Sequence, residues 1–467
     1  MKTKSMNHDK KHRRGAQFAA AVLGVVFAAG CEVTNPGPVS DEALILEAAQ
    51  QGFVNGAKER LTEALGQGAY STAFISRELF PGGTTGSYGQ GVNVQAGSMN
   101  WNESGNNSLY PNLQQARWIA EEAIRRLTEA KGSAQLLAEA RVYAGYASRM
   151  LGENYCEAVI DGGALQPGAT YFTRAQDHYT QAIALAPNTT AGNLIKSAAY
   201  AGRAQVQVWL KDWAGAAAAA AMITDLNYRF DQPMDFSTGS NPNQRNHLYF
   251  GASSTPYRSY SVKHTFYDQY YTDTGDPRTA WIKYTLPSDT LCVGSLQGYG
   301  RVPCLRPWKY KSENDAMRLS SGREMRLIEA EAMLTAGNIA GAMAKINQVR
   351  TSIKSDKAGN PALAAWPVPA TLAEAWTLLK RERGIELWLE MRRMGDQRRW
   401  DEGNVPGSYE LPNYEGTLGT KAALFRQYLR GRPVQVDGAE SVTPRQLCYN
   451  ISDVERNANP NIDDHAG

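Results

Sequence analysis

A helix with alternating small and aromatic positions is the feature that most constrains the fold of this chain. In Tyr171–Ala186 and the proline that follows it, the residues Ala175, Tyr179, Ala182 and Pro187 stand at offsets 0, 4, 7 and 12. Small residues allow two helices to approach closely, an aromatic ring fills the remaining gap, and proline ends the helix. This spacing predicts a helix that packs tightly against its neighbours along the chain.

Two further segments follow the same scheme as helical hairpins. Ala198–Leu210 turns into Ala216–Met222, and Arg323–Thr335 turns into Ala340–Thr351. The offsets are those of the small, aromatic, small and stop positions of a tetratricopeptide repeat. Because such a helix pair buries its apolar face only by stacking on the next pair, we expect a stack of helical hairpins.

The remaining chain completes a mainly α fold class. Amphipathic patterns predict helices over Glu42–Leu65, Leu109–Ala130 and Ala134–Gly152, and a helix pair over Leu372–Trp400. Asp231–Ser312 is instead rich in Tyr, Asn, Pro, Gly and Ser and has no helical period. We expect one domain over 41–467: a tetratricopeptide-like scaffold at about 41–230 and 313–402, a large irregular, loop-rich insert at about 231–312, and a tail at 403–467.

The first 30 residues have the pattern of an export signal. Six Lys and Arg precede residue 15, and Ala16–Gly30 is an apolar stretch too short to span a bilayer as a helix. Small residues lead directly to Cys31, as in a bacterial lipobox, so we expect Cys31 to be lipidated and 31–40 to form a tether. The alternative is an ordinary signal peptide followed by a coincidental cysteine.

The charge of the chain excludes one class of partner. The leader holds six basic residues and one acidic residue, so the 49 Lys and Arg and 46 Asp and Glu of the whole chain become 43 and 45 without it. The mature chain is therefore close to neutral. It lacks the basic footprint of a nucleic-acid-binding protein.

Four cysteines remain after Cys31. An even number in an exported protein favours disulfides, and no clustered His or CxxC motif suggests a metal. Four cysteines allow three pairings. Cys292 with Cys304 closes the shortest loop, worth roughly 3 kcal/mol in the chain-entropy model. Cys156 with Cys448 would then follow by elimination.

One segment is specific enough to indicate a family. Residues 382–400 read ERGIELWLEMRRMGDQRRW, which resembles the C-terminal signature of SusD/RagB proteins, the surface nutrient-binding lipoproteins. The matching positions are Glu382, Arg383, Glu386, Leu387, Glu390, Arg393, Asp396, Arg399 and Trp400. The chain departs at Met391, where the family usually has Gly, and at Gly384, where it often has Arg.

The similarity extends beyond this signature. The Asp-Pro-Arg turn that ends at Arg278, the Ala330-Glu331-Ala332 helix and the closing Asn459-Pro460 all resemble family elements. The resemblance implies a cell-surface, outer-membrane lipoprotein without catalytic activity or cofactor. Such a protein captures oligosaccharide or peptide and delivers it to a SusC-like TonB-dependent transporter, over which it sits as a lid.

The charged residues of the signature suggest structure rather than catalysis. Glu382, Glu386 and Glu390 are spaced to share one face of one helix, whereas glycoside hydrolysis needs two carboxyl groups across a cleft. Arginines interleave with them, so we expect a structural ion-pair network of Glu382, Arg383, Glu386, Glu390, Arg393, Asp396 and Arg399. The sequence contains no Gly-x-Ser-x-Gly nucleophile elbow, no HExxH motif and no phosphate-binding glycine loop before a helix.

Two aromatic segments, Tyr88–Asn107 and Tyr267–Trp308, offer the rigid rings and polar side chains that sugar binding needs. The resemblance implies that ligands are held by loops from these two parts of the chain. Side-chain chemistry selects Tyr88, Trp101 and Asn102 from the first, and Tyr270, Tyr271, Trp281, Tyr299 and Trp308 from the second. The competing interpretation is that these rings seal a satellite core. A protein of that kind would be a tetratricopeptide-type scaffold for protein–protein interaction without cargo. A third possible function, after nutrient binding and the scaffold, is that of an exported hydrolase.

Overall fold

The structure, a computed structural model, describes residues 47–82, 99–235, 244–253, 258–284, 290–293, 302–411 and 446–462. Contacts divide the chain into two compact units, Met1–Ala49 and Gln50–Gly467, and of the first unit only residues 47–49 are described. The predicted leader, Cys31, the tether, Tyr88 and Tyr299 lie outside the described residues.

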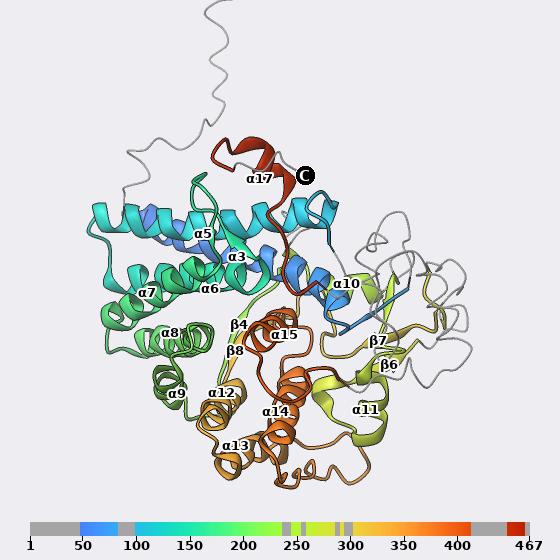
Figure 1. Ribbon diagram of the computed structural model, residues 1–467. Helices are drawn as coiled ribbons and strands as arrows, with labels where there is room; N and C mark the ends of the chain where they lie inside the picture. Colours follow the sequence, from blue (N-terminus) through green and yellow to red (C-terminus); the bar gives the residue numbers. More distant parts are fainter. Residues whose placement is uncertain are drawn as a thin grey trace, which may run out of the picture. The chain divides into compact units, whose positions relative to one another are not determined.

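Successive helices pack on one another along the chain. From α5 to α9 each helix contacts the next, α9 contacts α12, and α12 contacts α13 and α14 (Figure 1). Their bounds are α3 (Glu47–Ile75), α5 (Ser104–Glu129), α6 (Ala134–Asn154), α7 (Ala169–Leu185), α8 (Thr190–Trp209), α9 (Trp213–Ala221), α12 (Gly322–Thr335), α13 (Ile339–Thr351), α14 (Leu372–Glu386) and α15 (Arg393–Glu402). The predicted mainly α fold class is confirmed.

Local sequence signals set where six of these helices begin. Side-chain oxygens cap the first turn and accept hydrogen bonds from backbone N–H groups that have no partner within the helix. The capping residues are Ser133, Thr189, Asp212, Ser321, Asn338 and Thr371. At Thr371 the cap is reciprocal, because Glu374 accepts a hydrogen bond from the Thr371 backbone.

The small and aromatic positions pack as the spacing predicts. Tyr179 of α7 is fully buried, and its ring lies against Gly145 of α6 and Gly202 of α8. A Cβ atom at Gly145 would lie 2.6 Å from the ring, and one at Gly202 would overlap it as well. Close approach of three consecutive helices therefore depends on glycine at both positions.

Short antiparallel strand pairs join distant segments. Strand β4 (Arg229–Gln232) pairs with β8 (Met317–Ser321), so it bridges from the end of α9 to the beginning of α12. The other pairs are β1 (Phe80–Pro81) with β5 (Tyr260–Ser261), β2 (Glu157–Ala158) with β3 (Gln166–Pro167), and β6 (Trp281–Lys283) with β7 (Leu305–Pro307). Disulfides join Cys156 to Cys448 and Cys292 to Cys304.

The insert differs from the expectation that it has no helices. It contains α10 (His247–Ser253), α11 (Phe266–Thr274) and the 3-10 turn η2 (Pro277–Thr279). In α11 the rings of Phe266 and Tyr270 stack one turn apart at 5.0 Å, and Gly275 ends the helix with φ of 65°. The aromatic composition concealed this short helical spacing.

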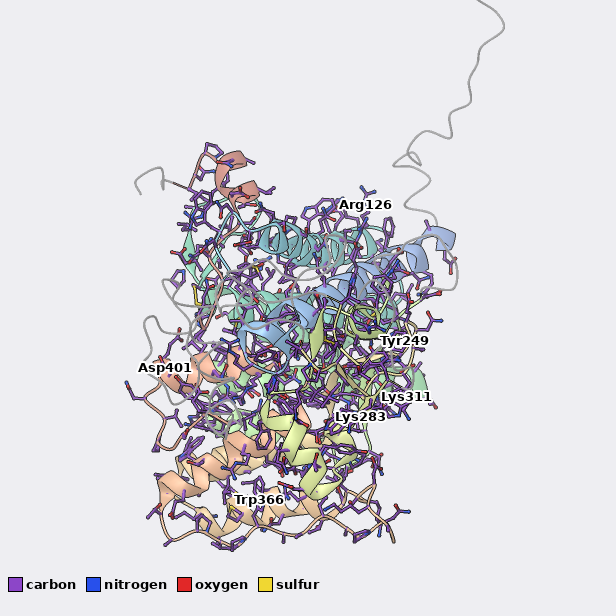
Figure 2. The ribbon with its side chains drawn as sticks, turned by 90° about the vertical axis from the view of Figure 1, so that its right-hand side faces the viewer. Arg126, Tyr249, Lys283, Lys311, Trp366 and Asp401 are labelled. Atoms are coloured by element: carbon purple, nitrogen blue, oxygen red, sulfur yellow. A yellow bond between two sulfur atoms is a disulfide. The ribbon has the colours of Figure 1, made fainter. Side chains whose placement is uncertain are left out.

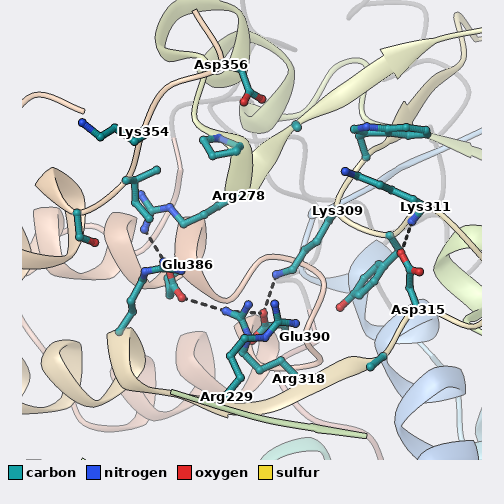
Figure 3. Close-up of a pocket in the computed structure, with 18 residues that line it drawn as sticks. Arg229, Arg278, Lys309, Lys311, Asp315, Arg318, Lys354, Asp356, Glu386 and Glu390 are labelled. Carbon is teal, nitrogen blue, oxygen red and sulfur yellow. Dashed lines mark hydrogen bonds and ion pairs between the residues drawn. The ribbon is translucent and has the colours of Figure 1, made fainter. Parts of the chain in front are cut away.

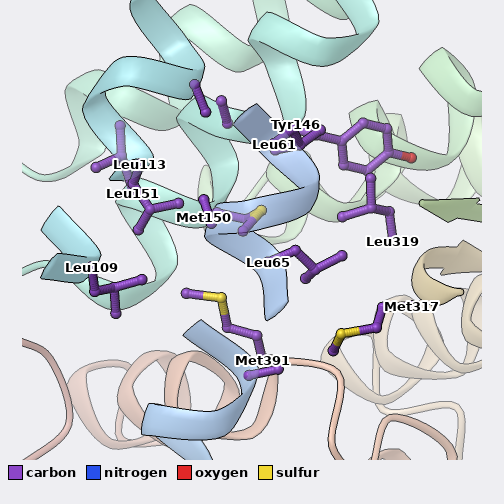
Figure 4. Close-up of a cluster of buried hydrophobic side chains, with 14 of the residues drawn as sticks. Leu61, Leu65, Leu109, Leu113, Tyr146, Met150, Leu151, Met317, Leu319 and Met391 are labelled. Atoms are coloured by element: carbon purple, nitrogen blue, oxygen red, sulfur yellow. The ribbon is translucent and has the colours of Figure 1, made fainter. Parts of the chain in front are cut away.

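The largest core cluster lies where α3 passes among its neighbours. Figure 4 shows Leu61 and Leu65 of α3 beside Met150 of α6, Leu319 of β8 and Met391. In the turned view of Figure 2, Arg126 of α5 and Trp366, which precedes α14, lie at opposite ends of the helix succession. The α17 helix (Asp453–Ala458) packs on α5. Among the described helices, none combines the length and apolarity needed to cross a membrane.

Candidate functional site

The signature segment, residues 382–400, forms the end of α14, a turn over residues 387–392, and most of α15. Leu389 and Met391 in the turn have φ of 61° and 60°, the left-handed region that interrupts a helix. Glu382 and Glu386 therefore lie on α14, but Glu390 lies in the turn. The expectation that all three carboxylates share one helix was wrong. Met391 occupies a conformation that suits Gly, and its buried side chain packs against Gly68 of α3.

Glu382 is fully buried and binds arginines from two distant segments. Arg278 Nη1 donates to one carboxylate oxygen at 2.8 Å, and Arg350 Nη1 donates to the other at 2.8 Å. Arg278 also pairs with Asp276 at 2.7 Å. These contacts tie α14 to the turn after α11 and to the last turn of α13.

Glu386 and Glu390 extend the network toward β7 and β8. Glu386 accepts from Arg278 at 3.0 Å and from Arg318 at 3.1 Å, and Glu390 accepts from Lys309 at 2.7 Å. Burial alone would raise the pKa of Glu386, but Arg278 and Arg318 outweigh it and lower that pKa. Burial lowers the pKa of Lys309 against the opposing effect of Glu390.

The rest of the predicted network ties α14 to α15 and α12. Asp396 accepts from Arg383 at 2.8 Å and from Arg399 at 2.9 Å, and Arg399 also pairs with Glu331. Burial would raise the pKa of Asp396, yet the two arginines lower it. Arg393 differs from the prediction, because it donates to the backbone carbonyls of Ser76 and Tyr409.

Sequence reasoning missed most of the partners. It paired the carboxylates with arginines of the same segment, whereas Glu382, Glu386 and Glu390 bind cations from the insert, β8 and α13. The missed cations are Arg278, Lys309, Arg318 and Arg350. Two of them carried a signal from the family resemblance: Arg278 ends the Asp-Pro-Arg turn, and Arg350 ends an Asn-x-x-Arg motif that begins at Asn347.

A cavity of about 790 Å³ opens beside this network (Figure 3). We call the paired residues Arg278, Lys309, Arg318, Glu386 and Glu390 its floor. Figure 3 shows Lys354 and Asp356 on one side, Lys311 and Asp315 on the other, and the floor between them. Other lining residues are Arg229, Pro277, Ala280, Trp308, Tyr310, Ala316, Arg323, Ser352 and Ile353.

The lining carries more positive than negative charge. Seven cationic residues and four carboxylates face the cavity. The floor accounts for three of the cations, and Arg229 pairs with Asp231 at 2.9 Å. For Lys311, Arg323 and Lys354, which we call the rim cations, the described part of the chain provides no ion pair.

The comparisons with known proteins address fold and family. Residues 306–467 match the family model described as the SusD family. A SusD superfamily protein from Bacteroides thetaiotaomicron aligns with a TM-score of 0.63 at 14% identity, over 89% of this chain and 98% of its own. The protein has the SusD fold, and its C-terminal third matches the SusD family.

Two more solved structures agree with this assignment. A SusD superfamily protein from Bacteroides fragilis aligns with a TM-score of 0.61 at 15% identity, over 89% of this chain and 99% of its own. A SusD-like carbohydrate binding protein from Bacteroides vulgatus aligns with a TM-score of 0.56 at 13% identity, over 76% of this chain and 83% of its own. Among curated proteins, none matches this sequence.

Within this SusD fold, the described aromatic candidates do not form one binding surface. Trp308 lines the cavity, and Tyr271 reaches its edge by donating to Asp356 at 3.1 Å. Tyr270 and Trp281 are half-buried and donate to Asp276 and to the Asp268 carbonyl. These two rings thus serve the packing of α11 and β6.

The described candidates of the first aromatic segment, Trp101 and Asn102, do not line the cavity. Trp101 is 46% exposed beside α17, whose Asp453 backbone N–H donates to the Trp101 carbonyl at 3.1 Å. Asn102 is also exposed, and neither residue lines the cavity. The structure therefore brings Trp308 to the cavity and leaves Trp101 and Asn102 outside it.

Proposed function

We propose that this protein is a cell-surface nutrient-binding lipoprotein. It captures oligosaccharide or peptide and delivers the cargo to a SusC-like TonB-dependent transporter of the outer membrane. The observation that carries the proposal is a SusD fold, with a SusD-family C-terminal third, beside an open cavity of about 790 Å³. That volume lies in the range of small-molecule sites. One relative of the same fold is described as carbohydrate binding.

Anchoring depends on the leader and Cys31. The cationic start, the short apolar stretch and small residues before Cys31 support export and lipidation of that thiol. More than one acyl chain is needed for stable membrane attachment, and a lipidated N-terminal cysteine supplies this. Mass spectrometry of the membrane fraction tests the anchor, and Cys31→Ser should release the chain from the membrane.

The carboxylates at the cavity support binding without catalysis. A glycosidase of the usual kind needs a protonated carboxyl group that donates to the leaving oxygen. Glu386 faces the cavity with a lowered pKa, and both of its oxygens accept hydrogen bonds from arginines. Glu390 pairs with Lys309. Both floor carboxylates are thus paired with cations, and the other two that line the cavity, Asp315 and Asp356, accept hydrogen bonds from Ser312 and Tyr271. We therefore assign the protein no enzymatic activity.

The competing function is a tetratricopeptide-type surface scaffold without cargo. The cavity favours cargo binding, because a pure scaffold has no use for an open polar cavity lined by a tryptophan. The test is binding of the full-length chain in detergent to a panel of oligosaccharides and peptides, together with co-purification of a β-barrel partner. If the chain bound none of these ligands and no β-barrel protein co-purified with it, the scaffold function would be favoured.

A further inference from the structure

The rim cations have no carboxylate partner among the described residues, although Lys311 Nζ lies over the Trp308 ring at 5.7 Å from its centroid. Lys311 and Lys354 are exposed at the cavity, and Arg323 is partly buried at the first turn of α12. Its Nε atom is buried and has no hydrogen-bond partner among the described residues. Because solvent does not reach the Nε atom, what Arg323 offers a ligand is the positive charge of the guanidinium group that lines the cavity.

The surroundings of Arg323 are electropositive. Burial lowers its pKa, and Arg278, Arg318 and Arg229 lower it further, with Glu386 as the opposing charge. That carboxylate, Glu386, is already shared between Arg278 and Arg318. An incoming anion would therefore meet a positive charge that the protein has not neutralised.

The neutral lining residues indicate what the anion is attached to. Trp308, Pro277 and Ala280 present apolar surface, which suits the C–H face of a sugar ring. Asp315 and Asp356 also line the cavity, where they would repel a bare anion but accept hydrogen bonds from hydroxyl groups. A ligand that suits both features carries hydroxyl groups and negative charge on one chain.

Resting on the proposed nutrient-binding role, we infer that this cavity takes an acidic oligosaccharide, a sugar chain with carboxylate or sulfate groups, which Lys311, Arg323 and Lys354 recognise. Cations on both sides of the cavity suit a ligand with more than one charge (Figure 3). The captured nutrient is then an acidic glycan rather than a neutral one.

The experiment compares probes that differ only in charge. Titration calorimetry on the full-length chain uses an oligogalacturonate and its methyl ester, and a sulfated galactan oligomer and its desulfated form. We expect one of the acidic probes to bind at least about tenfold more tightly than its neutral counterpart, and added salt to weaken that binding. The acidic probe that prevails distinguishes carboxylate from sulfate.

Variants connect this preference to the cavity. Arg323→Gln combined with Lys354→Gln should weaken the acidic probe about tenfold and leave the neutral probe unchanged. Arg323→Lys, which keeps the charge, should retain most of the affinity, and Lys58→Gln on α3 is the matched control outside the cavity. Equal melting temperatures of the variants and the wild type verify that the fold is intact.

Each other outcome overturns the inference in a different way. Equal binding of acidic and neutral sugars would overturn it while the nutrient-binding role stands. Tighter binding of oligoglutamate, also sensitive to the double variant, would replace the acidic glycan by an acidic peptide. Binding of no oligosaccharide or peptide, with no retention by a barrel, would remove both the inference and the proposed function.

Discussion

The floor of the cavity and its rim both contain lysine and arginine, but the floor cations pair with carboxylates and the rim cations do not. On the floor, Arg278, Arg318 and Lys309 each contact a buried carboxylate. At the rim, Lys311 and Lys354 reach solvent without an ion pair among the described residues. Buried charges require partners for the chain to fold, whereas charges near solvent do not. The contrast separates charges that maintain the fold from charges available to a ligand.

The largest loss of stability should come from Glu382→Gln, which breaks ion pairs of the buried network. It removes the anion shared by Arg278 and Arg350 and leaves buried positive charge, so we expect a loss of about 3–5 kcal/mol of unfolding free energy. Urea denaturation measures it. The control is Glu129→Gln on α5, an exposed partner of Arg125, which should cost less than about 1 kcal/mol. Similar losses at both sites would erase the contrast.

The second-largest effect should come from low pH, which should reduce the stability that the buried network contributes. Glu386 and Asp396 have lowered pKa values, so they contribute stability above the ordinary carboxyl pKa of about 4 and lose it as pH falls below that value. Asp396→Asn should flatten this acid-side decline in denaturation midpoints measured at successive pH values. An unchanged pH profile in the variant would show that Asp396 contributes nothing to it.

The rim should tolerate loss of charge. Arg323→Gln and Lys354→Gln, measured singly, should each change the unfolding free energy by no more than about 0.5 kcal/mol, because no described ion pair is broken. Arg318→Gln on the floor is the matched comparison and should cost several times more. A loss above about 2 kcal/mol for either rim variant would mean that the rim cation is structural.

The smallest effect should be that of Trp101→Ala on cargo affinity. Trp101 does not line the cavity, so affinity should change by less than about twofold, whereas Trp308→Ala should weaken binding several-fold. Calorimetry with the best-binding probe measures both. The reverse order would move the binding site to the first aromatic segment.

Helix periodicity made most of the fold predictable. The positions of Ala175, Tyr179 and Ala182 follow from helix geometry alone, and all three side chains are fully buried. The predicted Arg323–Thr335 and Ala340–Thr351 lie within one residue of α12 and α13 at each end. Local spacing carries this information because each hairpin packs chiefly on its neighbours in the chain.

The site was less predictable, because it is assembled over long range. Glu382 meets Arg278 across 104 residues and Arg350 across 32. No spacing rule on one helix can find such partners. The cavity has the same origin, since β4, β8, α12, α14, the turn after α11 and the segments that follow β7 and α13 all contribute to its lining. Trp308 was identified by chemistry, whereas Lys311, Arg323 and Lys354 had no pattern to mark them.

The bond between Cys156 and Cys448 determines how the chain responds to proteolytic cleavage. It closes a covalent ring over a sequence separation of 292 residues, and the adjoining Tyr155 and Tyr449 backbones form a parallel bridge beside it. A single peptide bond cut anywhere inside that ring releases no fragment. Nicked molecules should migrate as one species on a denaturing gel and separate into two only after a thiol reductant is added.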